Sequence, residues 1–276
     1  MLMGSLGRLA PVLALVGLLL LGACASSGRE AAGVPNHDDG DPLEPINRKI
    51  WAFDLALDRL LLKPVAEAYR DHTPAAAQIS VTNVLHNIKS PVILSNDLLQ
   101  GDADRASATA ERCVINTFLG FGGILDLAAA HGVPYHDADF GQTLGRWGVG
   151  PGPYLILPLL GPSDLRDGIG YAVDSVIDPF TIEMRAHGFA EGTYARLGVG
   201  VIAYRAKTIA SIDDVERESL DFYAAIRSLY RQQRKAVVAA AWSAGAGVPT
   251  TNPDSPDAGG PTPSSPPTQD AGKVHR

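Results

Sequence analysis

Hydrophobic residues recur at steps of three and four positions along most of this chain, a spacing that places them on one face of an α-helix. One such stripe runs through residues 46–60 and a second through residues 77–88. Further stripes occupy residues 165–176 and 197–204. The two-residue alternation typical of strands does not recur, and the sequence contains no internal repeat. The pattern therefore predicts an all-α fold.

Proline and capping residues predict where these helices begin and end. Pro64 is expected to interrupt the first stripe. Ser90-Pro91 predicts a helix start, because serine is a good N-cap and proline suits the first turn. Asp102 or Asp104 is expected to cap the alanine-rich helix that follows. Residues 211–214 (Ser-Ile-Asp-Asp) resemble a capping box and predict the start of the last helix.

Two segments carry no charged side chain. They are Val114–Leu125 and Trp147–Gly161, and glycine or proline interrupts both. Neither is long and regular enough to cross a bilayer as a simple helix. Two interpretations remain open at this point: buried core segments, or surface that faces acyl chains.

The N-terminus has the pattern of a signal peptide. Arg8 precedes an apolar run, and small residues stand before Cys24. This pattern resembles the signal of bacterial lipoproteins, in which the cysteine thiol takes a diacylglycerol and becomes the first residue of the mature chain. Ala25 and Ser26 follow, where an aspartate would indicate retention at the inner membrane, so the resemblance implies the outer membrane of a Gram-negative bacterium. The alternative is an ordinary secretory signal with an incidental cysteine.

Composition divides the rest of the chain. We expect a signal peptide over residues 1–23, a polar lipidated tether over 24–41, one domain over 42–242 and a tail over 243–276. The tail is rich in Pro, Ser, Thr and Gly and is expected to be disordered, because it has too few large apolar side chains to offset the entropy of ordering. The formal net charge is −7 and there is no basic cluster, which argues against binding of nucleic acid.

Few residues suggest catalysis or metal binding. The glycines of residues 120–123 follow a helical pattern and have no P-loop lysine, so they indicate a phosphate site only weakly. One cluster has the look of metal ligands, and a solvated loop or a helix cap explains it as well: His131, His136, Asp137 and Asp139. No Gly-x-Ser-x-Gly elbow is present. We therefore expect no enzyme activity, no metal and no cofactor, and a metal hydrolase remains only as an alternative.

The second charge-free segment is a long loop rich in glycine and proline. Such a loop is costly in water unless it is buried or functional. A structural turn packed on the core and a functional loop are both open interpretations. Its candidate residues are Gly148, Gly150, Gly152, Pro153, Tyr154 and Pro158.

Several blocks of this sequence resemble, in the same order, the motifs of the MlaA (VacJ) family. The resemblance covers residues 41–178 closely and the last helices loosely. The blocks are Asp41–Arg48, Asn96–Gly101, Arg112–Gly123, Phe140–Gly145, Gly148–Tyr154 and Leu165–Asp167.

This resemblance implies an outer-membrane lipoprotein that maintains lipid asymmetry. Family members remove mislocalised phospholipids from the outer leaflet and pass them to a periplasmic carrier, MlaC. The implied fold is a single helical ring-like domain embedded in one leaflet beside a trimeric porin, with an amphipathic central channel. A structural lipoprotein that only scaffolds porins is the alternative function.

The resemblance also assigns expected roles to residues. The Gly148–Pro158 segment resembles a loop beside the channel and is expected to gate it. Arg166 and Asp167 are expected near the channel, since charges buried elsewhere would be costly. Arg227, Arg231 and Arg234 on the last helix are candidates for carrier docking, and a solvated helical face is the alternative.

Overall fold

The computed structural model describes residues 41–243. The expected signal peptide, the lipidation of Cys24 and the disordered tail all lie outside the described residues. Within them the chain is helical except for one β-hairpin, which confirms the predicted all-α class. In chain order the elements are α2 (Glu44–Leu57), η1 (Asp58–Leu62), α3 (Lys63–His72), α4 (Ala75–Leu99), α5 (Ala103–Val114), η2 (Ile115–Leu119), α6 (Leu127–Ala130), α7 (Phe140–Arg146), β1 (Tyr154–Leu157), β2 (Gly161–Asp164), α8 (Leu165–Ile177), α9 (Pro179–Ala186), α10 (Ala190–Glu218) and α11 (Phe222–Ser243).

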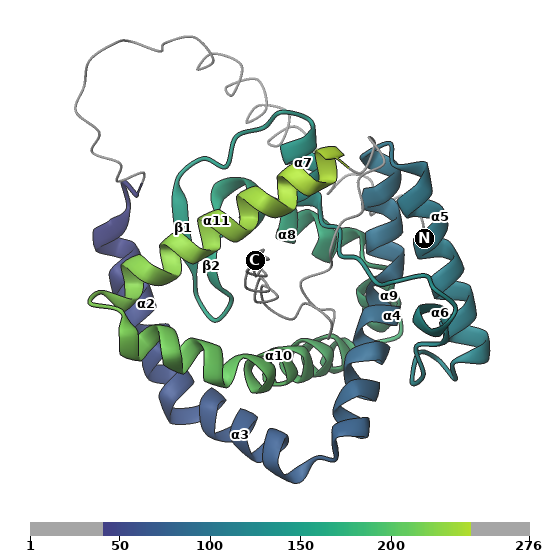
Figure 1. The fold of residues 1–276 in the computed structure, drawn as a ribbon, viewed down its shortest axis with the longest axis horizontal. Coiled ribbons are helices and arrows are strands. Elements are labelled where there is room, and N and C mark those ends of the chain that lie inside the picture. Colours follow the sequence, from purple (N-terminus) through teal and green to yellow (C-terminus); the bar gives the residue numbers. More distant parts are fainter. Residues whose placement is uncertain (1–40, 244–276) are drawn as a thin grey trace, which may run out of the picture.

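The helices form a ring (Figure 1). Helix α11 crosses one side in front of the hairpin, and α10 with α3 forms the opposite side. Helix α4 packs against α5 on a third side, and α2 joins the remaining corner. Side-by-side contacts between α10 and α3 and between α7 and α8 hold neighbouring segments together. The ring-like domain expected from the family resemblance is therefore present.

Helical structure continues past Pro64, contrary to the prediction. A π-helical turn, η1, links α2 to α3, and the Lys63 amide donates to the Asp58 carbonyl. Pro64 follows this wider turn and lies in the first turn of α3. A wider π-helical turn therefore accommodates the proline, and the helix does not end there.

Ser90-Pro91 does not open a helix either. Both residues lie inside α4, a helix of 25 residues. Ser90 is buried and its hydroxyl donates to the His86 carbonyl. Packing of α4 along α5 outweighs the local cost of the proline. The prediction for the next helix is correct, because Asp102 caps α5 by accepting the Arg105 amide at 3.0 Å.

Residues 211–214 do not start the last helix, because α10 runs through them to Glu218. The acidic side chains of this stretch form ion pairs instead of capping. Asp213 lies 2.7 Å from Lys63 Nζ, and Glu216 pairs with Arg59. These contacts fasten the end of α10 to the η1–α3 segment, so a tertiary contact has overridden the local capping pattern.

The loop expected over residues 148–158 contains the first strand of an antiparallel hairpin. Tyr154 pairs with Asp164 at its open end and Leu157 with Gly161 next to its turn. Asn47 of α2 joins this hairpin by three hydrogen bonds. Its Nδ2 donates to the Tyr154 carbonyl at 3.0 Å and to Asp41 at 2.8 Å, and its Oδ1 accepts the Ile156 amide at 3.0 Å.

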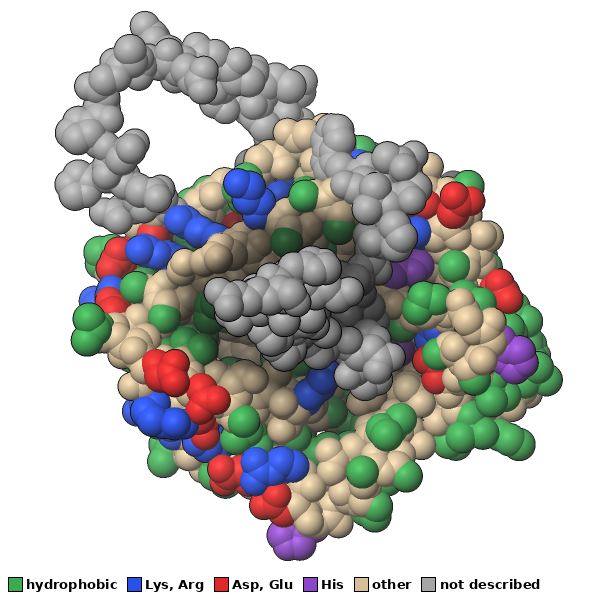
Figure 2. Space-filling model, in the orientation of Figure 1, with side chains coloured by type: hydrophobic (Ala, Val, Ile, Leu, Met, Phe, Trp, Pro, Cys, Tyr) green, Lys and Arg blue, Asp and Glu red, His purple; other side chains and the backbone are tan. Residues whose placement is uncertain are grey.

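The two charge-free segments differ in burial. Residues 114–125 lie mostly on the surface, where Phe118 is 78% and Phe121 is 73% exposed. Residues 147–161 are mixed, since Tyr154 and Ile156 are buried whereas Leu159 is exposed. Hydrophobic side chains gather at the edge of the ring formed by α5 and α6 (Figure 2). The core interpretation is thus wrong for the first segment and partly correct for the second.

No helix among residues 41–243 has the length and apolar content needed to cross a membrane.

We predict that Asn47→Ala lowers the free energy of unfolding by about 2–3 kcal/mol, because it leaves the Tyr154 carbonyl and the Ile156 amide buried without partners. Denaturant unfolding followed by circular dichroism measures this change. Asn83→Ala is the control, since Asn83 makes only a 3.4 Å contact to the Ile124 carbonyl and should change stability by less than about 0.5 kcal/mol. Equal losses in both variants would contradict a special role for Asn47.

Candidate functional site

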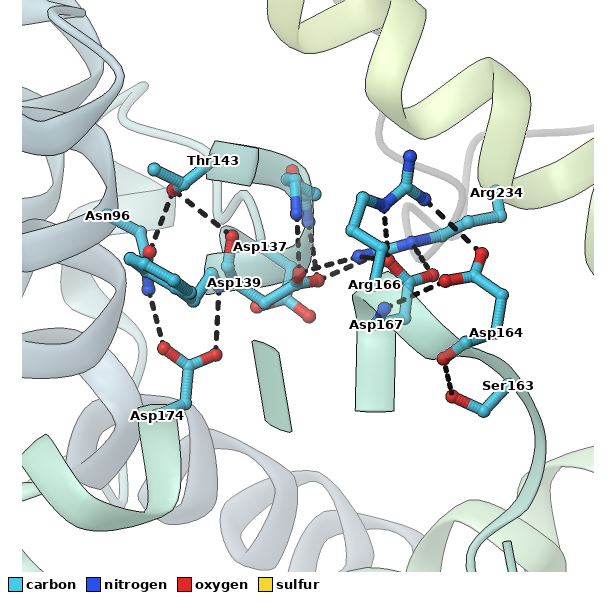
Figure 3. A network of polar contacts seen from close by, with 12 residues as sticks. Asn96, Asp137, Asp139, Thr143, Ser163, Asp164, Arg166, Asp167, Asp174 and Arg234 are labelled. Atoms are coloured by element: carbon cyan, nitrogen blue, oxygen red, sulfur yellow. Dashed lines mark hydrogen bonds and ion pairs between the residues drawn. The ribbon is translucent and has the colours of Figure 1, made fainter. Parts of the chain in front are cut away.

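A half-buried arginine of α11 joins three segments of the chain (Figure 3). Arg234 donates to both carboxylate oxygens of Asp139, at 2.8 and 2.6 Å. The same guanidinium donates to Asp167 at 2.9 Å, and its Nε also pairs with that residue. Asp139 precedes α7 and Asp167 lies in the first turn of α8, so one side chain ties α11 to both helices.

A second arginine extends the network toward the hairpin. Arg166 Nε donates to Asp167 at 2.9 Å, and Arg166 Nη2 lies 3.4 Å from Asp164 at the end of β2. Asp164 also caps α8 by accepting the Asp167 amide at 2.8 Å. The Tyr230 hydroxyl donates to Asp167 at 2.6 Å. This alternation of charges compensates each carboxylate with a nearby donor.

A second group of hydrogen bonds, also drawn in Figure 3, holds α7 between α4 and α8. Thr143 donates to Asn96 at 2.8 Å, and Asn96 donates to Asp174 at 2.9 Å. Asp174 also accepts the Phe140 amide at 3.0 Å. Asn96 and Thr143 are fully buried. Their hydrogen bonds therefore leave α4, α7 and α8 little freedom to shift relative to one another.

The fold shifts the pKa values of the three aspartates of this network in opposite directions. Burial by itself would raise the pKa of Asp139, but the hydrogen bonds and charge of Arg234 outweigh it and hold this pKa well below its usual value. Burial likewise opposes ionisation of Asp167, and bonds from Arg166 and Arg234 lower its pKa. For Asp164 burial dominates and raises the pKa to about 6. The lowered pKa values favour the anionic form of Asp139 and Asp167 at neutral pH, whereas burial disfavours that of Asp164.

A cavity of about 880 Å³ lies beside this network. One part of its wall is charged and another part is apolar, and both come from α11 together with the hairpin and its approach. The described residues that line it are Pro151, Gly152, Tyr154, Asp164, Arg166, Tyr230, Arg231, Arg234, Lys235, Val238 and Ala239. Its volume is within the usual range for small-molecule sites.

Some of the expected loop residues line the cavity, and others do not. Gly152 and Tyr154 line the cavity, and Pro153 lies between them. Gly152 has φ +70°, and a Cβ at this position would stand 3.2 Å from that of Leu165, so a larger residue is strained there. The cavity lining does not include Gly148, Gly150 or Pro158, all of which are exposed.

The expected channel residues meet in one place, and the three arginines of α11 do not share one environment. Arg166 lines the cavity with Asp167 directly behind it. Arg231 lines the cavity as well, with its guanidinium 5.6 Å from the centre of the Tyr154 ring.

The other two arginines point to carboxylates of their own chain. The side chain of Arg227 is 15% exposed and lies 3.4 Å from Asp41 and 3.3 Å from Glu44. That of Arg234 is 16% exposed. The ion pairs of Arg227 and Arg234 hold α11 in place. Docking of a carrier through this helix stays a prediction.

The four residues with the look of metal ligands are held by separate partners. His136 contacts Asp97 at 3.0 Å, and Asp137 pairs with Lys89 at 2.6 Å. Asp139 is occupied by Arg234, and His131 contacts the Leu127 carbonyl. Within residues 41–243 no three such side chains gather as a metal site would require.

Sequence reasoning missed Asp164, Tyr230 and the role of Lys235. A signal existed for each. Asp164 stands immediately before a predicted helix, where an N-cap is expected. Tyr230 and Lys235 flank two arginines at helical spacing, which places polar side chains on one inward face of α11.

Comparison with known proteins decides the family. The profile described as MlaA lipoprotein matches residues 39–237. The chain belongs to the MlaA family. This confirms the resemblance seen in the sequence motifs.

Named relatives and a solved structure agree with the assignment to the MlaA family. The chain is 34% identical over 222 residues to the intermembrane phospholipid transport system lipoprotein MlaA of Escherichia coli K12, covering 79% of this chain and 84% of that protein. An uncharacterized protein of Rickettsia bellii is 36% identical over 199 residues, or 72% of this chain and 76% of that protein. A structure solved for the "structural basis for maintenance of bacterial outer membrane lipid asymmetry" aligns with a TM-score of 0.64 and 33% identity, over 72% of this chain and 98% of the other.

We predict that Arg234→Met lowers the free energy of unfolding at pH 7 by about 2–4 kcal/mol, because half-buried Asp139 loses its cation and Asp167 keeps only Arg166. The pKa values of Asp139 and Asp167 are lowered by folding, so this stabilisation is present above about pH 4 and is lost as the pH falls through and below it. Unfolding measured at pH 7 and pH 3 should show a smaller difference between variant and wild type at pH 3.

Arg217→Met is the control for this prediction. Arg217 is 69% exposed and pairs only with Asp214, so its loss should cost less than about 0.5 kcal/mol at either pH. A loss for Arg234→Met that is the same at both pH values would indicate lost packing instead of lost charge compensation.

Proposed function

We propose that this protein removes mislocalised phospholipids from the outer leaflet of a Gram-negative outer membrane and passes them to a periplasmic carrier of the MlaC type. Its membership of the MlaA family supports this role, because relatives bear the name of an intermembrane phospholipid transport system. In this proposal it acts as a transport lipoprotein and catalyses no reaction.

The observation that carries the proposal is the cavity between α11 and the hairpin. A phospholipid has a charged headgroup and apolar chains, and a passage for it needs both kinds of wall. The cavity combines arginines, Arg166 and Arg234 among them, with apolar Val238, Ala239 and Pro151. Each buried charge in the wall is hydrogen-bonded within the chain, so the polar side is stable in an apolar environment.

The outer surface supports placement in one leaflet. The exposed hydrophobic side chains of residues 114–125 form a continuous charge-free segment at the α5–α6 edge. Contiguous exposed apolar patches mark contact sites with membranes or proteins. Insertion of this edge among acyl chains buries the patch, and helices satisfy their own backbone hydrogen bonds there.

Anchoring and partners complete the proposal. Cys24 would carry the lipid that holds the ring on the periplasmic side, and a trimeric porin would lie beside it. The Gly148–Pro158 segment would gate the cavity, since Gly152 and Tyr154 already form part of its wall.

We predict that deleting this protein raises the phospholipid content of the outer leaflet, measured by lipid labelling of intact cells. Wild-type protein should restore the normal content, whereas Cys24→Ala should not, because it cannot be lipidated. Cys113→Ala is the matched control and should restore it, since Cys113 is a half-buried residue of α5. An unchanged outer leaflet in the deletion strain, with porins lost or mislocalised, would favour the scaffold function.

We predict that Gly150→Val reduces lipid flux severalfold while leaving the domain folded. A Cβ at Gly150 meets no atom within 4 Å and its φ is not left-handed, so valine fits, but a β-branched residue stiffens the gating segment. Transfer of labelled phospholipid from vesicles that contain the protein measures flux. Gly198→Val of α10 has equally open space and should transfer lipid normally. Wild-type flux in Gly150→Val would remove the gating role.

A further inference from the structure

The turn of the β-hairpin holds a leucine in a strained backbone conformation. Pro158, Leu159 and Leu160 connect β1 to β2. Leu159 has φ +69°, in the left-handed region that leucine rarely adopts because its Cβ crowds the following carbonyl oxygen. Its side chain is 61% exposed, so packing of the leucine does not compensate for this strain. Another contact must therefore hold the turn in this conformation.

That contact comes from α2. The Leu159 amide donates to Asp54 Oδ1 at 3.0 Å. The other carboxylate oxygen, Oδ2, is buried and has no hydrogen-bond partner among residues 41–243. Burial raises the pKa of Asp54 above its usual value, and the bond from Leu159 offsets this effect only in part. A carboxylate with one buried oxygen unbonded lowers stability, so stability alone does not account for an aspartate at this position.

Helix α2 holds the hairpin at two points of different strength. Asn47 bonds the Tyr154 carbonyl and the Ile156 amide, whereas Asp54 bonds the strained turn. Asn47 and Asp54 are seven positions apart, which places them on one face of α2 and about 10 Å apart along it. The three residues from Ile156 to Leu159 extend over about the same length. Strand β1 therefore runs beside α2, as Figure 1 shows, and its attachment is firm at Asn47 and weak at Asp54.

The open end of the same hairpin forms part of the cavity wall. Tyr154 pairs with Asp164 there, and both residues line the cavity. A hairpin released at Asp54 can tilt about its attachment at Asn47, and this part of the wall then moves with it. Relaxation of the strain at Leu159 favours the release. The width of the cavity thus depends on where the turn is held.

We propose that Asp54 is the positioning residue of a lipid gate: its bond to Leu159 holds the hairpin turn in place, and release of this bond lets the hairpin tilt and widen the cavity for a phospholipid. This inference rests on the proposed function and adds to it the contact that keeps the passage narrow. The moving part of the gate is the hairpin turn, and its fixed part is the attachment at Asn47.

Amide hydrogen exchange and lipid transfer, measured on the full-length lipoprotein in vesicles, test this inference. Asp54→Ala should speed exchange of the Leu159 amide about tenfold and raise transfer of labelled phospholipid severalfold, because the turn loses its acceptor. Asp54→Leu, similar in shape and without an acceptor, should behave in the same way. Asp54→Asn keeps an acceptor oxygen and should stay within about threefold of wild type in both measurements. The Ile156 amide, which is bonded to Asn47, should exchange at the same rate in every variant.

Two substitutions at Leu159 separate backbone strain from loss of the side chain. Leu159→Gly and Leu159→Ala both remove the apolar side chain, but only glycine adopts φ +69° without strain. In the Asp54→Ala background, Leu159→Gly should bring lipid transfer back toward the wild-type rate, and Leu159→Ala should not. Equal transfer by these two double variants would overturn the role of strain in opening the gate.

Asp71→Ala is the matched control for the substitutions at Asp54. Asp71 is exposed and pairs with the adjacent Arg70, so its loss should change neither exchange at Leu159 nor lipid transfer. Circular dichroism should give all variants the helical content of wild type.

Different failures overturn different statements. Unchanged exchange of the Leu159 amide in both Asp54→Ala and Asp54→Leu overturns the role of Asp54 in holding the turn. Faster exchange without a rise in lipid transfer overturns the gate and leaves the proposed transport intact. A wild-type protein that transfers no labelled lipid overturns the proposed function itself, whatever the exchange rates.

Discussion

The structure depends on one half-buried cation. Arg234 of α11 holds the carboxylates of Asp139 and Asp167, and these two residues stand at the starts of α7 and α8. Without this contact Asp139 would lose its cation, Asp167 would lose one of two, and α11 would lose one of its attachments to α7 and α8. The ion pairs of Arg227 with Asp41 and Glu44 repeat the arrangement at the other part of α11. The helix is therefore fixed by charge as well as by apolar packing.

A ring has less interior than a compact bundle, and the chain compensates with hydrogen bonds. Many of its buried side chains are polar, among them Asn47, Asn96 and Thr143, and each is hydrogen-bonded to a distant segment. Meanwhile large hydrophobic residues such as Phe118 and Phe121 are exposed. This distribution of side chains is unfavourable in free energy when water surrounds it. It is favourable in a lipid leaflet, where apolar surface needs no burial and polar groups must be hydrogen-bonded within the protein.

The proposed lipid pathway follows from the same arrangement. The charges that fix α11 also form the polar wall of the cavity, so structural and functional demands coincide at Arg166 and Arg234.

The sequence by itself determined the helical class and the family, because periodicity and ordered motifs can be read along the chain. It also located the cap at Asp102, whereas it missed the cap at Asp164 before Leu165–Ile177. Tertiary structure alone decided that helices continue through Pro64 and Pro91, that residues 211–214 stay inside α10, and that Arg227 and Arg234 turn inward. For residues 211–214 and for the two arginines, partners more than 90 residues away outweighed a local preference worth about 1–3 kcal/mol, and no local pattern encodes such partners.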